Sequence, residues 1–281
     1  MNPIVRAAEI VYRGINRARR ALYRAGALHA KRLPRPVISI GNIVAGGAGK
    51  TPAVIALCRF LDSQGLRVAV LTRGHGRSGD GGVVSTADPA RFGDEPVLIK
   101  NRTDNVDVIV GSNRHNNALS YLAGNDCDVF VLDDGFQHLQ LHRDIDVVID
   151  APGDRFSREG RSALSEATFV VPRRLHMEVP PELLQKRVFA FSALADNEQF
   201  FGSLLAAGLE VVGTRGFGDH HRYSAADLDT VARLAAAAGA EQIVTTEKDA
   251  VKFSRRDIMP IRAVFVFETT VLERILDAVR R

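Results

Sequence analysis

The sequence predicts an α/β fold: a mainly parallel sheet flanked by helices, with a smaller C-terminal α/β domain and an N-terminal amphipathic helix. Three observations support this prediction. Residues 36–172 alternate apolar, β-branched runs with helical stretches, as parallel sheets covered on both faces do. A Pro-rich and charged stretch then leads into a second, shorter series of such runs over residues 173–281. Residues 1–35 combine apolar residues at helical spacing with many arginines.

The N-terminal segment is strongly basic. It holds nine lysines and arginines against one acid, Glu9, so residues 1–35 carry +8 while the whole chain carries +4. On a helix its apolar residues form one stripe and five arginines lie opposite. The stripe comprises Ile4, Ala8, Val11, Ile15, Ala18 and Leu22, and the arginines are Arg6, Arg13, Arg17, Arg20 and Arg24.

Two interpretations of this helix stay open. It either lies in the interface of an anionic membrane leaflet, or it packs on its own domain with a solvated basic face. Five arginines on one face favour the membrane. No apolar run approaches the ~18 residues of a transmembrane span, so we expect peripheral attachment. Basic charge confined to one end of an otherwise acidic chain argues against nucleic-acid binding.

The expected strands of the first unit are six apolar runs. Polar groups that follow them are candidate site residues, because open parallel sheets bind ligands at the carboxyl ends of their strands. The loop between Gly74 and Gly93 has room for a short hairpin at "GGVVST". The strands are "PVISI", "RVAVLTRG", "VDVIVG", "DVFVLDD", "IDVVIDA" and "ATFVV", with helices at "TPAVIALCRFLDSQG" and "RHNNALSYLAG".

The second unit follows the connection "PRRLHMEVPPELLQK". Its expected elements are "RVFAFSAL", "LEVVGTRGF", the helix "AADLDTVARLAAAAG", "QIVTTEKDAVKF", "AVFVFE" and the closing helix "TVLERILDAVRR". Cys58 and Cys127 are too few and too far apart for a disulfide framework or a zinc motif, which indicates a reducing cytosolic setting.

A glycine-rich loop directly follows the first expected strand. Its glycines let backbone N–H groups turn inward around phosphate, Lys50 can reach the β/γ oxygens, and Thr51 offers a hydroxyl to Mg²⁺. The strict Walker pattern is broken because Val44 occupies its first glycine position. The loop nevertheless predicts a P-loop NTPase-like unit that binds nucleotide through Gly46, Gly47, Ala48, Gly49, Lys50, Thr51 and Pro52.

A pair of carboxylates supplies the other half of a metal site. "VFVLDDGFQH" delivers Asp133 and Asp134 to the end of an apolar strand, where P-loop proteins hold Mg²⁺. Capping of the following turn is the structural alternative for these aspartates. His138 is equally compatible with a structural and a functional role.

Three further polar clusters lie at expected strand ends or helix starts, and each is weak evidence alone. "GDEP" places Asp94 and Glu95 at a helix start, where Asp94 could simply cap. "GDHHRY" puts His220 and His221 beside Asp219, a pairing that can act as a base. "TTEKDAVKF" places Lys248 and Asp249 at a strand-to-helix turn, where a capping box is the alternative.

Together these stretches resemble tetraacyldisaccharide 4′-kinase, the lipid A kinase of Gram-negative bacteria. The matching blocks are "GNIVAGGAGKTP", "LTRGHG", "GDEPVLIKNR", "VLDDGFQH" with "RDIDVVIDA", "GDHHRYS" and "TTEKDAVKF". The family's loop likewise lacks the first glycine. The resemblance implies a kinase that uses ATP and Mg²⁺ to phosphorylate the 4′-hydroxyl of a lipid disaccharide 1-phosphate, the lipid A precursor. It also implies peripheral attachment at the cytoplasmic face of the inner membrane, and we expect a monomer.

The resemblance also implies residue roles. Asp94 and His220 match the family's catalytic carboxylate and its paired histidine, which would accept the proton of the attacking hydroxyl. Lys50 would hold the β/γ phosphates and Arg158 would neutralise charge on the transferring phosphoryl. Thr51, Asp133 and Asp134 would serve the metal, and Glu95, Gln137, His138 and Glu159 would bind substrate or support the site.

Two departures from the family and three rival functions remain. The segment "APGDRFSREGRSAL" is shorter than the family's, which affects the approach to Arg158, and the N-terminal anchor is less hydrophobic. Another P-loop small-molecule kinase would explain the phosphate loop and the aspartates. A nucleotide-dependent switch or assembly ATPase would consume ATP without any acceptor. Because the candidate chemical groups are all present, a binding module without catalysis is the weakest alternative.

Overall fold

The first unit is built on a seven-stranded sheet in the order β3-β4-β2-β5-β1-β6-β7. In this computed structural model, which describes residues 3–44, 46–151 and 156–281, all six predicted parallel strands are confirmed. Part of "GGVVST" forms an edge strand that pairs antiparallel with β4. The strands are β1 (Val37–Asn42), β2 (Val68–Thr72), β3 (Gly82–Val83), β4 (Asp107–Val110), β5 (Val129–Asp133), β6 (Ile145–Asp150) and β7 (Phe169–Pro172).

Helices cover both faces of this sheet, which explains its continuous apolar strands. α2 (Lys50–Ser63) and α4 (Asp94–Asn101) pack on one face, and α5 (Arg114–Leu122) packs on the other. α2 buries Val54, Leu57, Cys58 and Leu61, whose spacing of three to four residues places them on one side of a helix. The short helices are α3 (Pro89–Phe92) and the 3₁₀ helix η1 (Arg161–Glu166).

The second unit is a five-stranded sheet in the order β10-β9-β11-β12-β8. Its neighbours are parallel except β8, which pairs antiparallel with β12. α6 and α7 pack into separate apolar clusters of this unit. The elements are β8 (Leu175–Glu178), the 3₁₀ helix η2 (Pro181–Leu183), β9 (Arg187–Ser192), α6 (Asn197–Ala206), β10 (Glu210–Gly216), α7 (Ala225–Ala237), β11 (Gln242–Thr246), α8 (Glu247–Ala250) and β12 (Ile258–Phe265).

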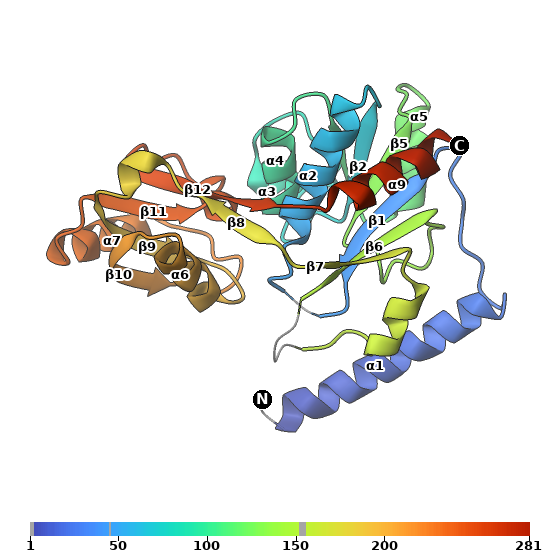
Figure 1. Cartoon of the computed structure of the whole chain (residues 1–281), viewed down its shortest axis with the longest axis horizontal. Helices are drawn as coiled ribbons and strands as arrows, with labels where there is room; N and C mark the ends of the chain where they lie inside the picture. The colour runs from blue at the N-terminus through green and yellow to red at the C-terminus, as the bar shows by residue number, and fades with distance from the viewer. Residues whose placement is uncertain (1–2, 45, 152–155) are drawn as a thin grey trace.

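The last helix does not pack with the second unit, as the expected boundary of 173–281 would require. α9 (Thr269–Arg280) returns to the first unit, where Ile275 and Leu276 are buried in the same apolar cluster as α2 (Figure 1). The stretch expected to be only a connection also contains β8. Two adjacent passages of chain therefore join the units, and Val266 N–H donates to Arg174 O at 3.0 Å between them.

The N-terminal helix α1 (Pro3–Arg24) lies against the first unit (Figure 1). Part of its polar side faces inward. Its buried side chains are Glu9, Asn16 and Arg20. The apolar stripe faces solvent instead: Val11 is 62% exposed and Ile15 55% exposed. Along the described residues, no helix combines the length and apolar character that a membrane crossing requires.

Arg20 fixes α1 to the first unit. We expected it on the exposed basic face, but it is 6% exposed and ion-pairs with Glu159, with Nη2 to Oε1 at 2.8 Å. It also donates to Glu166 at 2.8 Å and to Phe136 O at 3.0 Å. Burial of an arginine requires such partners, since an unpaired buried charge is strongly unfavourable. The polar side of α1 therefore holds the contacts to the protein, and its apolar stripe stays uncovered.

Candidate active site

The glycine-rich loop leads from β1 into α2. Gly47 and Gly49 adopt left-handed backbone conformations, with φ of 55° and 82°, which residues other than glycine rarely adopt. A Cβ on Gly49 would also lie 2.8 Å from Leu175 of the second unit. α2 then begins at Lys50, so its N-terminal N–H groups and positive dipole end face the loop.

Lys50, Asp134 and Arg158 form one charged group beside this loop. Lys50 Nζ lies 3.5 Å from Asp134 Oδ1, and Arg158 Nη1 contacts both carboxylate oxygens of Asp134 at 3.0 and 2.8 Å. Burial alone would raise the pKa of Asp134, but the two cations outweigh it and lower the pKa. Asp134 therefore stays ionised and holds both cations at the loop.

Asp133 is in the opposite situation. It is buried at the end of β5, and Thr72 donates to its Oδ2 at 2.9 Å. Burial, Glu95 and Asp134 together raise its pKa to about 7. Its Oδ1 has no hydrogen-bond partner among the described residues. A buried carboxylate oxygen without a donor is costly, and a cation would offset both the missing donor and the neighbouring negative charge.

These residues fit a magnesium ion that arrives with a nucleotide. The described residues contain no group of three or more Asp, Glu, His or Cys side chains that could hold a metal alone. Mg²⁺ in phosphate-transferring proteins needs only one or two protein ligands, because phosphates and water complete its shell. The free Asp133 Oδ1 and the Thr51 hydroxyl, at the cavity lining, suit that arrangement.

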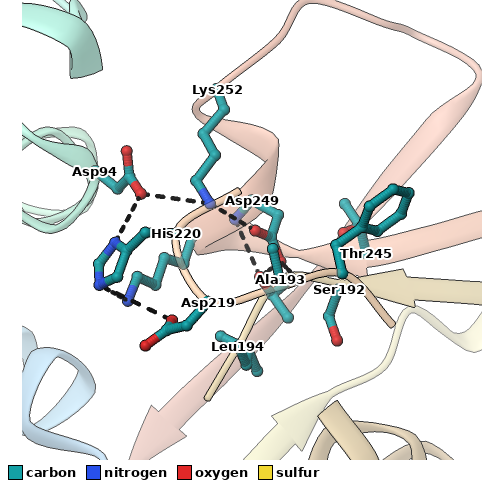
Figure 2. Close-up of polar contacts among 12 residues, drawn as sticks. Asp94, Ser192, Ala193, Leu194, Asp219, His220, Thr245, Asp249 and Lys252 are labelled. Atoms are coloured by element: carbon teal, nitrogen blue, oxygen red, sulfur yellow. Dashed lines mark hydrogen bonds and ion pairs between the residues drawn. The ribbon is translucent and has the colours of Figure 1, made fainter. Parts of the chain in front are cut away.

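Asp94 and His220 meet across the two units, although 126 residues separate them. Asp94 opens α4, and its Oδ2 lies 3.3 Å from His220 Nδ1 (Figure 2). Burial would raise the pKa of Asp94, but the His220 hydrogen bond and Lys252 outweigh it and lower the pKa. His220 has φ of 57°, a strained conformation that non-glycine residues hold mainly where the surroundings, often a functional site, impose it.

Ion pairs tie α4 to α8 and the turn after it. Lys248 Nζ lies 3.0 Å from Glu95 Oε1 and 3.5 Å from His220 Nε2. Burial would raise the pKa of Glu95, but Lys248 outweighs it and lowers the pKa. Arg102 and Glu247 form a further pair at 2.5 Å. The first turn of α4 is therefore held by cations of the second unit.

A cavity of about 840 Å³ lies at the carboxyl ends of the strands of both sheets. It accommodates a nucleotide and part of an acceptor, since small-molecule sites commonly occupy 300–1,000 Å³. Asp94 does not line it, so His220 faces the cavity with Asp94 behind it. The predicted residues that line it are Gly46, Gly47, Ala48, Gly49, Lys50, Thr51, Pro52, Glu95, Asp133, Asp134, Gln137, His138, Arg158, Asp219, His220 and Lys248.

Besides Asp94, three candidate site residues singled out in the sequence lie outside the cavity lining: Glu159, His221 and Asp249. Glu159 is buried against Arg20 of α1 and does not line the cavity, so its contacts support the helix and not the site. His221 bonds Asp227 at 3.1 Å, at the start of α7, and is likewise outside the cavity lining. Of the shortened segment before Arg158, residues 152–155 lie outside the described part of the chain.

A basic wall of the cavity, formed by Arg19, Arg73 and Arg114 around His138, was not predicted from the sequence. Arg114 is 5% exposed and forms no ion pair among the described residues. It lies 3.4 Å from His138 Nδ1, and burial together with Arg114 lowers the pKa of His138 to about 4. His138 is therefore neutral at pH 7. Arg114 opens α5, four positions after β4 ends, and could have been found from the rule that sites gather near strand ends.

Replacing Asp133 with Asn is expected to stabilise the metal-free protein more at pH 8 than at pH 5. Because folding raises the Asp133 pKa to about 7, the folded state binds its proton more tightly, and stability is lost as pH rises from about 4 to 7. Asn has no such loss, so the stabilisation by the substitution should grow by about 3 kcal/mol between the two pH values. Thermal and denaturant unfolding in EDTA measure this.

The exposed Asp80→Asn variant is the control and should differ from the parent equally at both pH values. A benefit of Asp133→Asn that is the same at pH 5 and pH 8, or larger at pH 5, would contradict this account of the buried carboxylate.

The chain matches the tetraacyldisaccharide-1-P 4′-kinase family over residues 1–171 and 159–280. A tetraacyldisaccharide 4′-kinase of Anaeromyxobacter dehalogenans strain 2CP-C is 38% identical, over 87% of this chain and 79% of that protein. Another, from Geobacter metallireducens, is 37% identical over 84% of each. The crystal structure of "apo" form LpxK from Aquifex aeolicus in complex with ATP is 28% identical with a TM-score of 0.77, over 97% of this chain and 98% of that one. The chain belongs to the tetraacyldisaccharide-1-P 4′-kinase family.

Proposed function

We propose that this chain transfers the γ-phosphoryl group of ATP to the 4′-hydroxyl of a tetraacyldisaccharide 1-phosphate, in the biosynthesis of lipid A. Family membership supports the reaction class. The observation that carries the mechanism is that the phosphate loop and His220, which Asp94 contacts from behind, face one cavity. A nucleotide switch needs the loop but has no use for a histidine–carboxylate pair aimed at an acceptor.

The loop N–H groups and Lys50 would hold the β and γ phosphates of ATP. Arg158, fixed by Asp134, would neutralise charge that develops on the transferring phosphoryl. Thr51 and Asp133 would hold Mg²⁺, which supplies further charge neutralisation when it is bound with the nucleotide. The basic wall around Arg114 suits substrates that both carry phosphate groups.

His220 would act as the general base. Asp94 contacts Nδ1, so the proton of the neutral ring is held on Nδ1 and the lone pair of Nε2 faces the cavity. Nε2 would accept the proton of the 4′-hydroxyl as its oxygen forms the new bond to the γ-phosphorus. The bond between that phosphorus and the β–γ bridging oxygen breaks, and ADP leaves.

The proposal is tested by mass analysis of a detergent-dispersed tetraacyldisaccharide 1-phosphate after incubation with Mg²⁺ and ATP. We expect lipid-dependent ATP consumption and one added phosphoryl per lipid. His220→Ala and Asp94→Ala should lower kcat by about 10²- to 10⁴-fold with little change in ATP affinity, as loss of a general base does. Lys50→Ala should weaken both ATP binding and turnover.

His221→Ala is the matched control, because this neighbouring histidine is outside the cavity lining. It should retain the parent kcat. ATP consumption that does not need lipid, without a lipid product, would replace the kinase with the switch or assembly ATPase.

Peripheral attachment to the cytoplasmic face of the inner membrane is part of the proposal. The apolar stripe of α1 is exposed, arginines flank it, and Tyr12 and Arg19 of the same helix line the cavity. An amphipathic helix with these features lies in the interface of an anionic leaflet. This placement would bring the lipid headgroup to the mouth of the cavity.

The double variant Val11→Ser/Ile15→Ser is expected to bind anionic vesicles about tenfold more weakly or worse, because two exposed apolar side chains are lost from the inserted face. Sedimentation with vesicles of mixed neutral and anionic phospholipid measures this. Leu205→Ser/Leu234→Ser removes two exposed leucines of the second unit and should bind like the parent. Equal vesicle binding by all three proteins would mean that α1 does not attach the chain.

A further inference from the structure

A buried ion pair lies behind the Asp94–His220 pair and outside the cavity lining. Asp249 is 0% exposed, and its Oδ2 accepts from Ala193 N–H at 3.0 Å and from the Thr246 hydroxyl at 2.8 Å (Figure 2). Its Oδ1 accepts from Lys252 Nζ at 2.9 Å. The Lys252 side chain is itself 5% exposed. Asp249 is thus held by three donors, and it fixes the position of the Lys252 ammonium group.

The same ammonium group reaches across to the first unit. Lys252 Nζ lies 3.4 Å from Asp94 Oδ2, the oxygen that also contacts His220 Nδ1 (Figure 2). One carboxylate oxygen therefore has a cation on one side and the histidine ring on the other. The opposite ring nitrogen, Nε2, is directed toward Lys248 and the cavity.

Stability alone does not explain this arrangement. Desolvation of two charges largely cancels their attraction, and well-packed apolar residues often replace a buried ion pair without loss. A lysine that only neutralised Asp249 would not need its ammonium group against Asp94 as well. The contact to Asp94 instead joins two units that share this site, because Asp249 and Lys252 follow β11 whereas Asp94 opens α4.

We propose that Lys252, oriented by Asp249, is a positioning residue that holds the Asp94 carboxylate against His220 and so aims the histidine at the acceptor hydroxyl. This inference rests on the proposed kinase function. Lys252 touches neither the cavity nor the reacting groups, and it acts only through Asp94. Its removal should leave the carboxylate free to turn away from Nδ1, and the ring then loses its fixed orientation.

Lys252→Met tests this in the full-length chain, with steady-state transfer from γ-labelled ATP to tetraacyldisaccharide 1-phosphate as the assay. We expect kcat to fall about 10- to 100-fold, the loss that a small misplacement of a catalytic group causes, while the KM for ATP stays within about twofold. Lys252→Arg keeps the positive charge and should recover part of the lost turnover. If Lys252→Met does not fold, the double variant Asp249→Asn/Lys252→Met replaces it, because it removes both buried charges together. The double variant should show the same fall in kcat.

A double-mutant cycle separates positioning from a merely structural role. In an Asp94→Ala background, Lys252→Met should cause no further loss of kcat, because the carboxylate it positions is already absent. The label keeps residual turnover measurable after the roughly 10⁴-fold loss that removal of a general base can cause. Lys100→Met is the control, since this lysine of α4 donates to Val106 O at 2.9 Å, outside the cavity lining. It should keep the parent kcat.

Unchanged kcat in Lys252→Met, the same fold-loss with and without Asp94, or failure of both the single and the double variant to fold would overturn the inference. Absence of a lipid product from the unaltered chain would overturn the proposed function and this inference together. If the unaltered chain forms the lipid product and the folded Lys252 variants keep the parent kcat, the inference alone would be overturned.

Discussion

The ion pairs between α4 and the α8 region are the interaction on which the site depends. Each sheet alone supplies half of the chemistry: the first carries the phosphate loop and the aspartates, and the second carries His220. α4 forms ion pairs with the second unit, and the acids in its first turn also match the positive end of its dipole. The pairs are Asp94–Lys252 at 3.4 Å, Glu95–Lys248 at 3.0 Å and Arg102–Glu247 at 2.5 Å.

The charges around the cavity are largely paired within the chain. Most of the carboxylates are matched by a cation of the chain, as Asp134 is by Arg158 and Glu95 is by Lys248. Asp133 keeps an oxygen without a donor, and Arg114 has no ion-pair partner among the described residues. A site for a metal-bound phosphate requires a carboxylate that can bind the metal and a cation that can bind the phosphate, both facing one cavity. On the proposed function, Mg²⁺ and the phosphates of ATP would supply the complement of both charges.

Local patterns in the sequence predicted the strands and many of the site residues. The apolar runs mark strands, and the rule that ligands bind at strand ends is enough to place Lys50 and Asp133 together. The Asp94–His220 contact needed the family resemblance, because no periodicity relates residues 126 positions apart. Lys252 was missed for the same reason, since its partner in the first unit is set by how the two units pack.

The helices at the two ends of the chain show a second limit of the sequence pattern. The amphipathic pattern of α1 correctly predicted an apolar face and a polar face. Which of the two packs against the first unit depends on Glu159 and Glu166, which lie far along the chain and pair with Arg20. Polar residues on a helix are ordinarily assigned to solvent, so Arg20 could not be recognised as a buried contact. α9 has the amphipathic pattern of an ordinary surface helix, so the pattern alone does not say which unit it covers. It packs on the first unit because β12 ends there.

We propose that Asp94 holds His220 with the other ring nitrogen, Nε2, toward the acceptor and beside Lys248. The ¹⁵N chemical shifts of the His220 ring, recorded at pH 8 on the full-length protein and assigned with His220→Gln, report its tautomer directly. This account predicts a protonated Nδ1 and an unprotonated Nε2, a state that should be lost when Asp94 is replaced by Ala. A protonated Nε2 with an unprotonated Nδ1 in the unaltered protein would contradict it, because the nitrogen that faces the cavity could not then accept the hydroxyl proton.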